Sequence, residues 1–584
     1  MRVLRWFISP AAWALLLYAA GAFALTHVAW RTPGAAWAGS CCDPQQTIWY
    51  VRWAPYAVGH LVNPFFIDQL NAPYGVNAMW NTPVFAASLL VSPITLLWGP
   101  VVAFNFLVTA AIALSGWCAY LALRRYSHGN AGPLIGGAVY GFSPYVVPQA
   151  LLHLPLALAF VPPLFLLVLD ELLIRRRRSP LLLGVALGVL VAVQLLTEEE
   201  LVVTSALMAV VMIAVLAWRR WGEVVLLWRP VGKAITAAAL TGLVLCALPL
   251  AVQFFGPQRV HGQLQDPESF STDLLNLVVP THHQLIAPDA AATLAGHFTG
   301  GFDFEANAYI GFPLLLLLTA FTATHWKDLR IRAAAIVAAA AFLLSLGPHL
   351  HIGGASTGWP LPFWLFTHVP LLQDIQPNRL AVLMWLAIAV LVAVAVDRAL
   401  TGRFWTQMVP RLGVLGVALV AILPAGLPVT TADIPVFFQR WSDHGIPDSA
   451  TVLIAPFFRD GAGAAPMLWA AVAGGGVRMP EAYAFIPAAD GSPMYGPIGT
   501  TLTRTMESIQ DTGVVIIVRG PVRDQVARDL RTLGVQDVIV GPMDNRDQMI
   551  AFFTDLFGRS PRVVEGVQIW SQIQQAGVAP PPAS

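Results

Sequence analysis

Long apolar runs separated by short polar turns fill the first three quarters of the chain. A helix that crosses a bilayer needs about 20 mostly apolar residues. Eleven runs approach or reach this length, at 7–29, 101–123, 131–149, 155–174, 180–197, 201–218, 233–254, 309–324, 333–347, 381–397 and 412–429. A twelfth run, 84–99, is short and has Pro93 near its middle. The pattern predicts a polytopic α-helical membrane protein with about eleven transmembrane helices.

The positions of arginine and lysine predict the topology. If Arg2 and Arg5 lie in the cytoplasm and 84–99 does not cross, the cytoplasmic turns carry 18 basic residues, against four outside before residue 430. Cytoplasmic loops of membrane proteins are enriched in Lys and Arg. We therefore expect a cytoplasmic N-terminus and a segment 84–99 that lies in, or dips into, the outer interface. The parts expected outside are the loops 30–100, 255–308 and 348–379 and the C-terminal part.

The pattern changes near residue 430, which ends the predicted transmembrane domain, 1–429. Beyond it, short apolar runs alternate with amphipathic ones, which is typical of a soluble α/β domain. We predict an extracytoplasmic α/β domain over 430–575 with a mostly parallel sheet, and a disordered tail over 576–584. Strands are expected at 451–458, 513–520, 536–542 and 562–570, and helices at 521–534 and 546–558.

Composition and charge exclude several classes of protein. Hydrophobic residues make up 57% of the chain and charged residues 11%, with a mean hydropathy of +0.66, which excludes an ordinary soluble protein. The formal net charge of +1 excludes nucleic acid as the main partner. The four cysteines form neither a disulfide framework nor a zinc-binding spacing.

The first outer loop, 30–100, has an acid near its start. Asp43 is expected at the membrane surface, where a carboxylate could act as the general base for an incoming hydroxyl. The alternative is a solvated aspartate or a cap for the next helix. Aromatic residues of this loop, among them Trp49 and Trp53, are expected at the level of the lipid headgroups. Gln45 and Asp68 are candidate substrate contacts.

Three consecutive glutamates, 198–200, lie at the outer junction of two predicted spans. Adjacent carboxylates repel one another and raise their own pKa values unless they are paired. Acids at membrane depth are costly and therefore suggest function. We expect Glu198 or Glu199 to face a cavity and bind sugar hydroxyls or orient an acceptor. A water-exposed turn is the alternative.

Arg379 is one of only four basic residues expected on the outer side of the membrane part. Its guanidinium could hold a phosphate and stabilise the charge that develops as this phosphate leaves. Snorkelling to lipid headgroups is the alternative. Arg259 and Arg52 are weaker candidates for the same task.

Outer histidines are numerous, but no spacing typical of a metal site accompanies them. We therefore predict no metal site and no certain cofactor, while a requirement for a divalent cation stays open. His153, in a short loop beside Pro155, is a candidate for the lining of a donor site. The acids within 266–273 and 301–307 are either acceptor contacts or exposed loop residues.

Taken together, the chain resembles the GT-C superfamily of membrane glycosyltransferases. The shared features are one N-terminal span, a large outer loop with an early acid, about eleven spans and an outer C-terminal domain. Segments such as GSCCDPQQTIWYVRWAPYAV, LVVPTHHQLIAP and LSLGPHL resemble uncharacterised bacterial proteins akin to the YfhO-type polytopic proteins. Many GT-C members carry two adjacent acids in the first loop, whereas this chain has the single Asp43.

The resemblance implies an inverting glycosyltransferase of the cell membrane. Its donor would be a polyprenyl-phosphate-linked sugar, its acceptor an extracytoplasmic glycan, lipid or protein, and its base Asp43. A transporter or flippase of a lipid-linked glycan is the alternative, although the internal repeats typical of transporters are not evident. A membrane scaffold without catalysis is a third interpretation.

Overall fold

A computed structural model describes residues 9–40, 42–401, 404–458, 464–497, 499–514 and 519–573. Arg2, Arg5, half of the predicted strand 513–520 and the predicted tail 576–584 lie outside the described residues. The chain forms two compact units. The helical unit comprises Met1–Arg31, Phe106–Ala247 and Gln263–Pro428, and the mixed unit comprises Thr32–Asn105, Leu248–Gly262 and Val429–Ser584.

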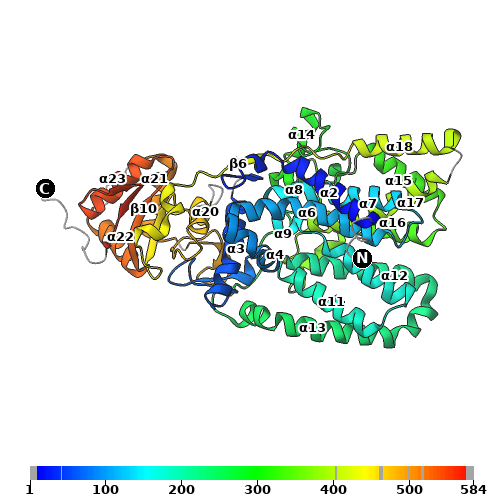
Figure 1. Ribbon diagram of the computed structural model, residues 1–584, viewed down its shortest axis with the longest axis horizontal. Coiled ribbons are helices and arrows are strands. Elements are labelled where there is room, and N and C mark those ends of the chain that lie inside the picture. The colour runs from blue at the N-terminus through cyan, green and yellow to red at the C-terminus, as the bar shows by residue number, and fades with distance from the viewer. Residues whose placement is uncertain are drawn as a thin grey trace. The chain divides into compact units, whose positions relative to one another are not determined.

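Among the described residues, each of the eleven predicted apolar runs contains helix (Figure 1), although the run 412–429 is helical only as far as Val420. The run 131–149 is divided into two helices, and Pro148 lies in the first turn of the second, where a missing N–H costs little. The helices of these runs are α2 (Pro10–Thr26), α6 (Pro100–Leu123), α7 (Ala131–Gly141), α8 (Val146–Leu152), α9 (Leu154–Ala157), α10 (Val161–Asp170), α11 (Pro180–Leu195), α12 (Glu199–Leu226), α13 (Trp228–Phe255), α15 (Phe312–Thr324), α16 (Leu329–Ser345), α17 (Ala381–Leu400) and α18 (Val409–Val420).

Five helical segments among the described residues are long and apolar enough to cross a membrane: Pro100–Leu123, Leu154–Arg175, Glu199–Trp218, Trp228–Phe255 and Pro377–Leu400. Shorter apolar helices add to these, and the number of eleven spans stays a prediction. The segment 84–99 forms α4 (Phe85–Leu90) and α5 (Ser92–Trp98), of six and seven residues, and neither has the length of a span.

Helix α17 is the most enclosed of these segments. Along its most apolar stretch 89% of the residues are buried, against 17% for α13. Helix α7 packs closely against α17, because a Cβ atom at Gly136 would lie only 2.7 Å from the carbonyl oxygen of Ala389. Glycine at this position lets the two backbones approach. The close packing fixes the position of α17 and of the residues directly before it.

The loops between these helices contain short ordered elements. They include η4 (Leu274–Leu277), α14 (Asp289–Ala295), η6 (Asp303–Glu305), the hairpin β4 (His349–Ile352) and β5 (Ala355–Pro360), η7 (Pro362–His368) and η8 (Pro377–Leu380). Two of the loops contact each other. The Asp273 carboxylate accepts a hydrogen bond of 2.8 Å from the Gly354 amide, and His349 contacts Glu268. These contacts hold the loop 255–308 against the loop 348–379.

The mixed unit contains a four-stranded sheet of order β11-β12-β10-β7. Its strands are β7 (Thr451–Ala455), β10 (Val535–Val540), β11 (Arg562–Val564) and β12 (Val567–Trp570). Among the strands that the structure describes in this sheet, β7 and β10 pair in parallel, whereas β10 with β12 and β11 with β12 pair antiparallel. The described part of the sheet is therefore not mostly parallel, which differs from the prediction. The run 562–570 was expected to be one strand, but it turns back at Glu565 and Gly566, which have φ values of 41° and 92°. This turn makes an antiparallel hairpin.

Helices α21 (Thr501–Thr512), α22 (Pro521–Thr532) and α23 (Arg546–Phe557) pack on the sheet. Their buried side chains, which include Leu502, Met506 and Phe553, meet Val538 and Leu453 of the strands. The helices predicted at 521–534 and 546–558 are therefore confirmed.

The loop predicted at 30–100 packs with C-terminal residues in the same unit. Helix α3 (Asp43–Gly59) lies against α20 (Ala465–Val472). Trp49 and Trp53 of α3 are buried, so the expectation that they lie at headgroup level is wrong, because α3 turns them into protein. Cys42, which precedes α3, is disulfide-bonded.

Candidate functional site

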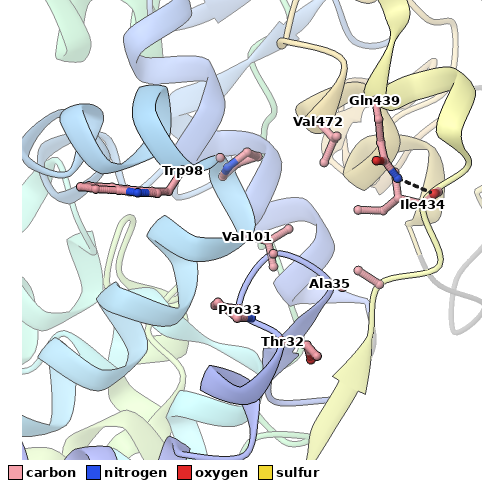
Figure 2. A pocket seen from close by; sticks show the side chains of 12 residues that line it. Thr32, Pro33, Ala35, Trp98, Val101, Ile434, Gln439 and Val472 are labelled. Atoms are coloured by element: carbon pink, nitrogen blue, oxygen red, sulfur yellow. Dashed lines mark hydrogen bonds between the residues drawn. The ribbon is translucent and has the colours of Figure 1, made fainter.

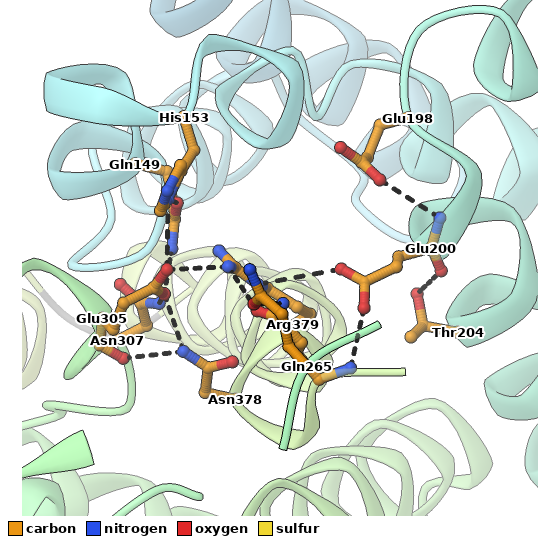
Figure 3. A network of polar contacts seen from close by, with 11 residues as sticks. Gln149, His153, Glu198, Glu200, Thr204, Gln265, Glu305, Asn307, Asn378 and Arg379 are labelled. Atoms are coloured by element: carbon orange, nitrogen blue, oxygen red, sulfur yellow. Dashed lines mark hydrogen bonds and ion pairs between the residues drawn. The ribbon is translucent and has the colours of Figure 1, made fainter. Parts of the chain in front are cut away.

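A buried ion pair between Glu305 and Arg379 is the centre of a polar network in the helical unit (Figure 3). Arg379 Nη2 lies 2.7 Å from Glu305 Oε1, and the two side chains are 4% and 0% exposed. Glu305 ends η6, and Arg379 lies in η8, directly before α17. Two irregular segments thus present opposite charges to each other away from water.

The Glu305 carboxylate is surrounded by hydrogen-bond donors. Oε2 accepts bonds from Gln149 Nε2 and Asn378 Nδ2, each 2.7 Å, and from Asn307 Nδ2 at 3.3 Å. His153 Nδ1 lies 3.1 Å from Oε1. A buried carboxylate is stable only when it is paired and hydrogen-bonded, and Glu305 satisfies both conditions.

These contacts keep Glu305 ionised. Burial by itself would raise the pKa of Glu305, but the charges of Arg379 and His153 and the hydrogen bonds to the carboxylate lower this pKa to about 2. The carboxylate therefore stays an anion at neutral pH and acts as an acceptor of hydrogen bonds, not as an acid.

The glutamates at the start of α12 approach the other side of Arg379. Glu200 Oε2 lies 3.8 Å from Arg379 Nε, and Glu200 Oε1 accepts a hydrogen bond of 2.7 Å from the Gln376 amide. Glu198 Oε1 accepts a longer bond, 3.3 Å, from the Glu200 amide. The sequence pointed to Glu198 and Glu199, but the contact with Arg379 is made by Glu200.

Glu198 differs from Glu305 in its protonation. Burial raises the pKa of Glu198 to about 7, and the positive charge of Arg379 limits this rise. Glu305 is therefore ionised throughout the neutral range, whereas Glu198 changes its charge near pH 7.

Arg379 retains donor capacity that the protein does not use. Gln376 Oε1 accepts from Nε at 3.0 Å and from Nη2 at 2.6 Å. Nη1 is buried and has no hydrogen-bond partner among the described residues. The same holds for the hydroxyl of Tyr145 and for Asn378 Oδ1. Unsatisfied buried donors and acceptors are rare and costly, and in this network they are suited to the polar atoms of a ligand.

Asp43 lies in the mixed unit, as the first residue of α3. The Tyr483 hydroxyl donates a hydrogen bond of 2.7 Å to Asp43 Oδ1, and the Tyr483 ring stacks on Phe458. Gln46 contacts the carbonyl oxygen of Tyr483. A partly buried acid is thus held in one orientation by a tyrosine from the C-terminal part of the chain.

The other predicted residues have separate surroundings. Gln45 accepts a hydrogen bond of 2.6 Å from the Ala464 amide and so supports the loop before α20. Asp68 and Arg259 are exposed, and Arg259 Nη1 contacts the carbonyl oxygen of Phe254 at 3.4 Å. Glu199 is the first residue of α12 and lies between Glu198 and Glu200 in the sequence.

A second buried acid of the mixed unit, Glu481, was not a candidate from sequence. Glu481 Oε1 accepts a hydrogen bond of 3.0 Å from the Ile454 amide, and Oε2 has no partner among the described residues. Burial raises the pKa of Glu481 to about 8. The side chain is therefore mostly protonated at neutral pH.

This raised pKa predicts a pH-dependent stability. The folded state binds a proton that the unfolded state loses above its ordinary pKa near 4.5. The stabilisation is complete below that pH and is lost as the pH rises through about 8, by up to about 1.4 kcal/mol per pH unit. Thermal unfolding measured from pH 5 to 9 tests this. We expect E481Q to lack this part of the fall in stability with rising pH. The exposed control D524N should decline like the wild type, and an equal decline in E481Q would contradict the assignment.

A pocket of about 530 Å³ also lies in the mixed unit (Figure 2). Trp98 lies at its edge, and Gln439 donates a hydrogen bond of 3.0 Å to the carbonyl oxygen of Ile434. The residues that line it are Thr32, Pro33, Gly34, Ala35, Trp98, Gly99, Pro100, Val101, Ala432, Ile434, Gln439 and Val472. None of these side chains is an acid or a base, so the pocket offers no group for proton transfer.

Among the described residues, no group of three or more His, Cys, Asp or Glu side chains is arranged to hold a metal ion. His282 and His283 flank Asp303 at 3.5 and 3.3 Å. These contacts lower the pKa of Asp303, chiefly through the hydrogen bond from His283. His349 and His351, which form the other histidine pair of the sequence, contact the Glu268 carboxylate.

A model of a domain of unknown function, DUF6311, matches residues 7–372, more than half of the chain. The chain therefore belongs to the DUF6311 family. Among curated proteins, none matches this sequence.

Solved structures show the fold of this DUF6311 protein. The arabinofuranosyltransferase AftD from mycobacteria aligns over 97% of the chain and 40% of its own, with a TM-score of 0.53 and 18% identity. The DUF6311 protein thus spans about two fifths of the length of AftD. This match confirms the GT-C-like fold that the sequence predicted.

Two further structures are similar at TM-scores of 0.47 and 13% identity. The oligosaccharyltransferase AglB from Archaeoglobus fulgidus, with an inhibitory peptide and a dolichol-phosphate, aligns over 92% of this chain and 70% of its own. ArnT from Cupriavidus metallidurans, bound to undecaprenyl phosphate, aligns over 98% of this chain and 100% of its own.

Proposed function

We propose that this protein is an inverting membrane glycosyltransferase that uses a polyprenyl-phosphate-linked sugar and an extracytoplasmic glycan, lipid or protein acceptor. The observation that carries the proposal is the buried Arg379 donor without a partner, within a network of acids, on a GT-C-like fold. A buried guanidinium held by Glu305 and Gln376 is already oriented before a substrate arrives, which is how preorganised electrostatic stabilisation works.

The reaction needs one base and one group that stabilises the leaving phosphate. We assign the base to Asp43, which takes the proton of the acceptor hydroxyl as its oxygen attacks the anomeric carbon. The bond from that carbon to the phosphate oxygen breaks, and the polyprenyl phosphate leaves with the electron pair. Inversion at the anomeric carbon follows from this single displacement.

We assign the phosphate contact to Arg379 Nη1. Arg379 faces Glu305 and Glu200, so its charge alone does not make the site cationic, and directed hydrogen bonds to a ligand oxygen matter more. His153 and Glu198, which border the network, are assigned to the sugar hydroxyls. Glu199, Gln45, Asp68 and Arg259 stay candidate substrate contacts.

We expect R379K to weaken binding of polyprenyl phosphate about tenfold or more. Lysine keeps the positive charge but has no planar fork of N–H groups, and a hydrogen bond to a charged group contributes about 1.5–3 kcal/mol. Binding of polyprenyl phosphate to the purified protein measures the effect. R31K, at an exposed outer arginine, is the matched control, and equal binding by R379K and wild type would remove this role.

Incubation of the purified protein with radiolabelled polyprenyl-phosphate sugars and a panel of glycan acceptors tests the activity itself. Transfer of label to an acceptor is the expected result. Movement of the labelled lipid across vesicle membranes without transfer would instead favour a transporter. If no donor gives either transfer or movement of the labelled lipid, the result would favour a scaffold.

A further inference from the structure

We propose that the helical unit contains a separate site for an anionic glycerophospholipid, in a cavity between α10, α12, α16 and α17. The phosphate headgroup would bind Arg125, Arg175 and Arg330, and an acyl chain would occupy the apolar part. This site does not depend on the proposed glycosyl transfer, because none of the residues of the Glu305–Arg379 network lines the cavity.

The cavity has a volume of about 370 Å³ and a mostly apolar lining. Along α12 it extends from Ser205 to Leu216, which corresponds to about 16 Å at the rise of an α-helix. Side chains of the neighbouring helices, such as Phe165, Val337 and Val390, complete the wall. A long, narrow apolar space matches the shape and chemistry of an acyl chain.

The charged part of the lining lies near helix ends: just after α6, at and just beyond the end of α10, and in the first turn of α16. Arg125, Arg175 and Arg330 line the cavity there, with side chains 33%, 28% and 36% exposed. The guanidinium groups are therefore accessible to a ligand, and most of the apolar wall behind them is buried or half-buried.

Neighbouring carboxylates fix the positions of these arginines. Arg125 Nη1 lies 3.0 Å from Glu171, Arg175 Nε lies 2.8 Å from Asp170, and Arg330 also donates a hydrogen bond of 2.7 Å to the carbonyl oxygen of Tyr126. Each arginine has five N–H donors, so such contacts leave donors for a phosphate.

Positive charge is in excess around the cavity. The segments 124–130, 170–178, 325–332 and 397–401 together hold ten lysines and arginines and four acids. By contrast, the Glu305–Arg379 network combines one arginine with several acids. An anionic headgroup therefore has an electrostatic reason to bind at the arginines of the cavity.

The predicted topology identifies the source of the lipid. The basic turns are expected in the cytoplasm, and basic pockets between transmembrane helices on that side bind anionic lipid headgroups. The inner leaflet supplies glycerophospholipids directly beside such a pocket. We therefore assign the cavity to a phospholipid of that leaflet and not to the sugar donor.

Native mass spectrometry of the full chain with phosphatidylglycerol or phosphatidylcholine tests the proposal. We expect tighter binding of phosphatidylglycerol to the wild type. R330Q should weaken this binding about fivefold or more. The Asp328 carboxylate is not left without a partner in this variant, because it keeps its ion pair with Arg398 Nη2, 2.7 Å away. A333F, which fills the cavity from α16, should weaken it as well.

Matched controls lie on the same helix. Arg332 and Ala335 of α16 do not line the cavity, so R332Q and A335F should bind phosphatidylglycerol within about twofold of the wild type. Equal binding of the two phospholipids by the wild type would overturn the proposal. An equal loss of phosphatidylglycerol binding in R330Q and R332Q would overturn it too. So would displacement of phosphatidylglycerol by polyprenyl phosphate, if R330Q abolished this displacement and R379K left it intact.

Discussion

Replacement of Asp43 by asparagine is expected to reduce sugar transfer about a hundredfold or more. A general base contributes about 10²–10⁴ to a rate, and an amide oxygen cannot take the proton of the acceptor. The change is nearly isosteric, and the side-chain oxygen of the asparagine could still accept the hydrogen bond of 2.7 Å that Tyr483 donates to Asp43. Transfer from a labelled polyprenyl-phosphate sugar, measured at equal amounts of folded protein, gives the result.

Asp289 provides the matched control for this prediction. It is exposed and, like Asp43, is the first residue of a helix, α14. D289N should therefore keep the wild-type rate, whereas an effect shared by D43N and D289N would indicate a loss of helix stability. Wild-type activity in D43N would show that another group acts as the base.

The single variants E305Q and R379Q are each expected to lower the free energy of unfolding by about 3–5 kcal/mol. Removal of one partner leaves the other buried without its nearest opposite charge, which is more costly than removal of both. The double variant R379Q/E305Q should therefore lose clearly less than the sum of the two single losses. Denaturant unfolding in mixed micelles, followed by tryptophan fluorescence, measures all three changes.

The exposed pair Arg440 and Glu565 is the control for this cycle. Its atoms lie 2.9 Å apart, but the side chains are 61% and 28% exposed, and such pairs contribute about 0–1 kcal/mol. R440Q and E565Q should change stability little. Additive losses in the Glu305–Arg379 cycle would mean that the buried pair is not coupled.

The sequence allows the helices to be predicted because burial in lipid demands long apolar runs. It also singles out Arg379, because the topology predicted by the positive-inside rule expects this arginine, unlike most basic residues of the membrane part, on the outer side. His153 and Glu198 are candidates because of their places near the ends of predicted spans. These signals are local, and each can be read within a few dozen residues.

The contacts that build the network are not local. Gln149 and Glu305 are 156 positions apart, and Tyr483 and Asp43 are 440 apart. No periodicity predicts that the loop with Glu305 becomes buried, and neutral side chains such as Gln149 and Asn378 give no charge signal. Trp49 shows the same limit, because an aromatic residue in an outer loop suits both a lipid interface and a protein interior.

The close packing of α7 against α17 affects how inactive variants are interpreted. Arg379 directly precedes α17, so a side chain larger than glycine at position 136 would displace the helix that carries the guanidinium. In a random mutagenesis screen for lost transfer, Gly136 would be recovered together with the residues assigned to chemistry, although it carries no polar side chain. Positions of this protein that do not tolerate substitution will therefore include residues that position the Arg379 guanidinium as well as residues that contact the substrate.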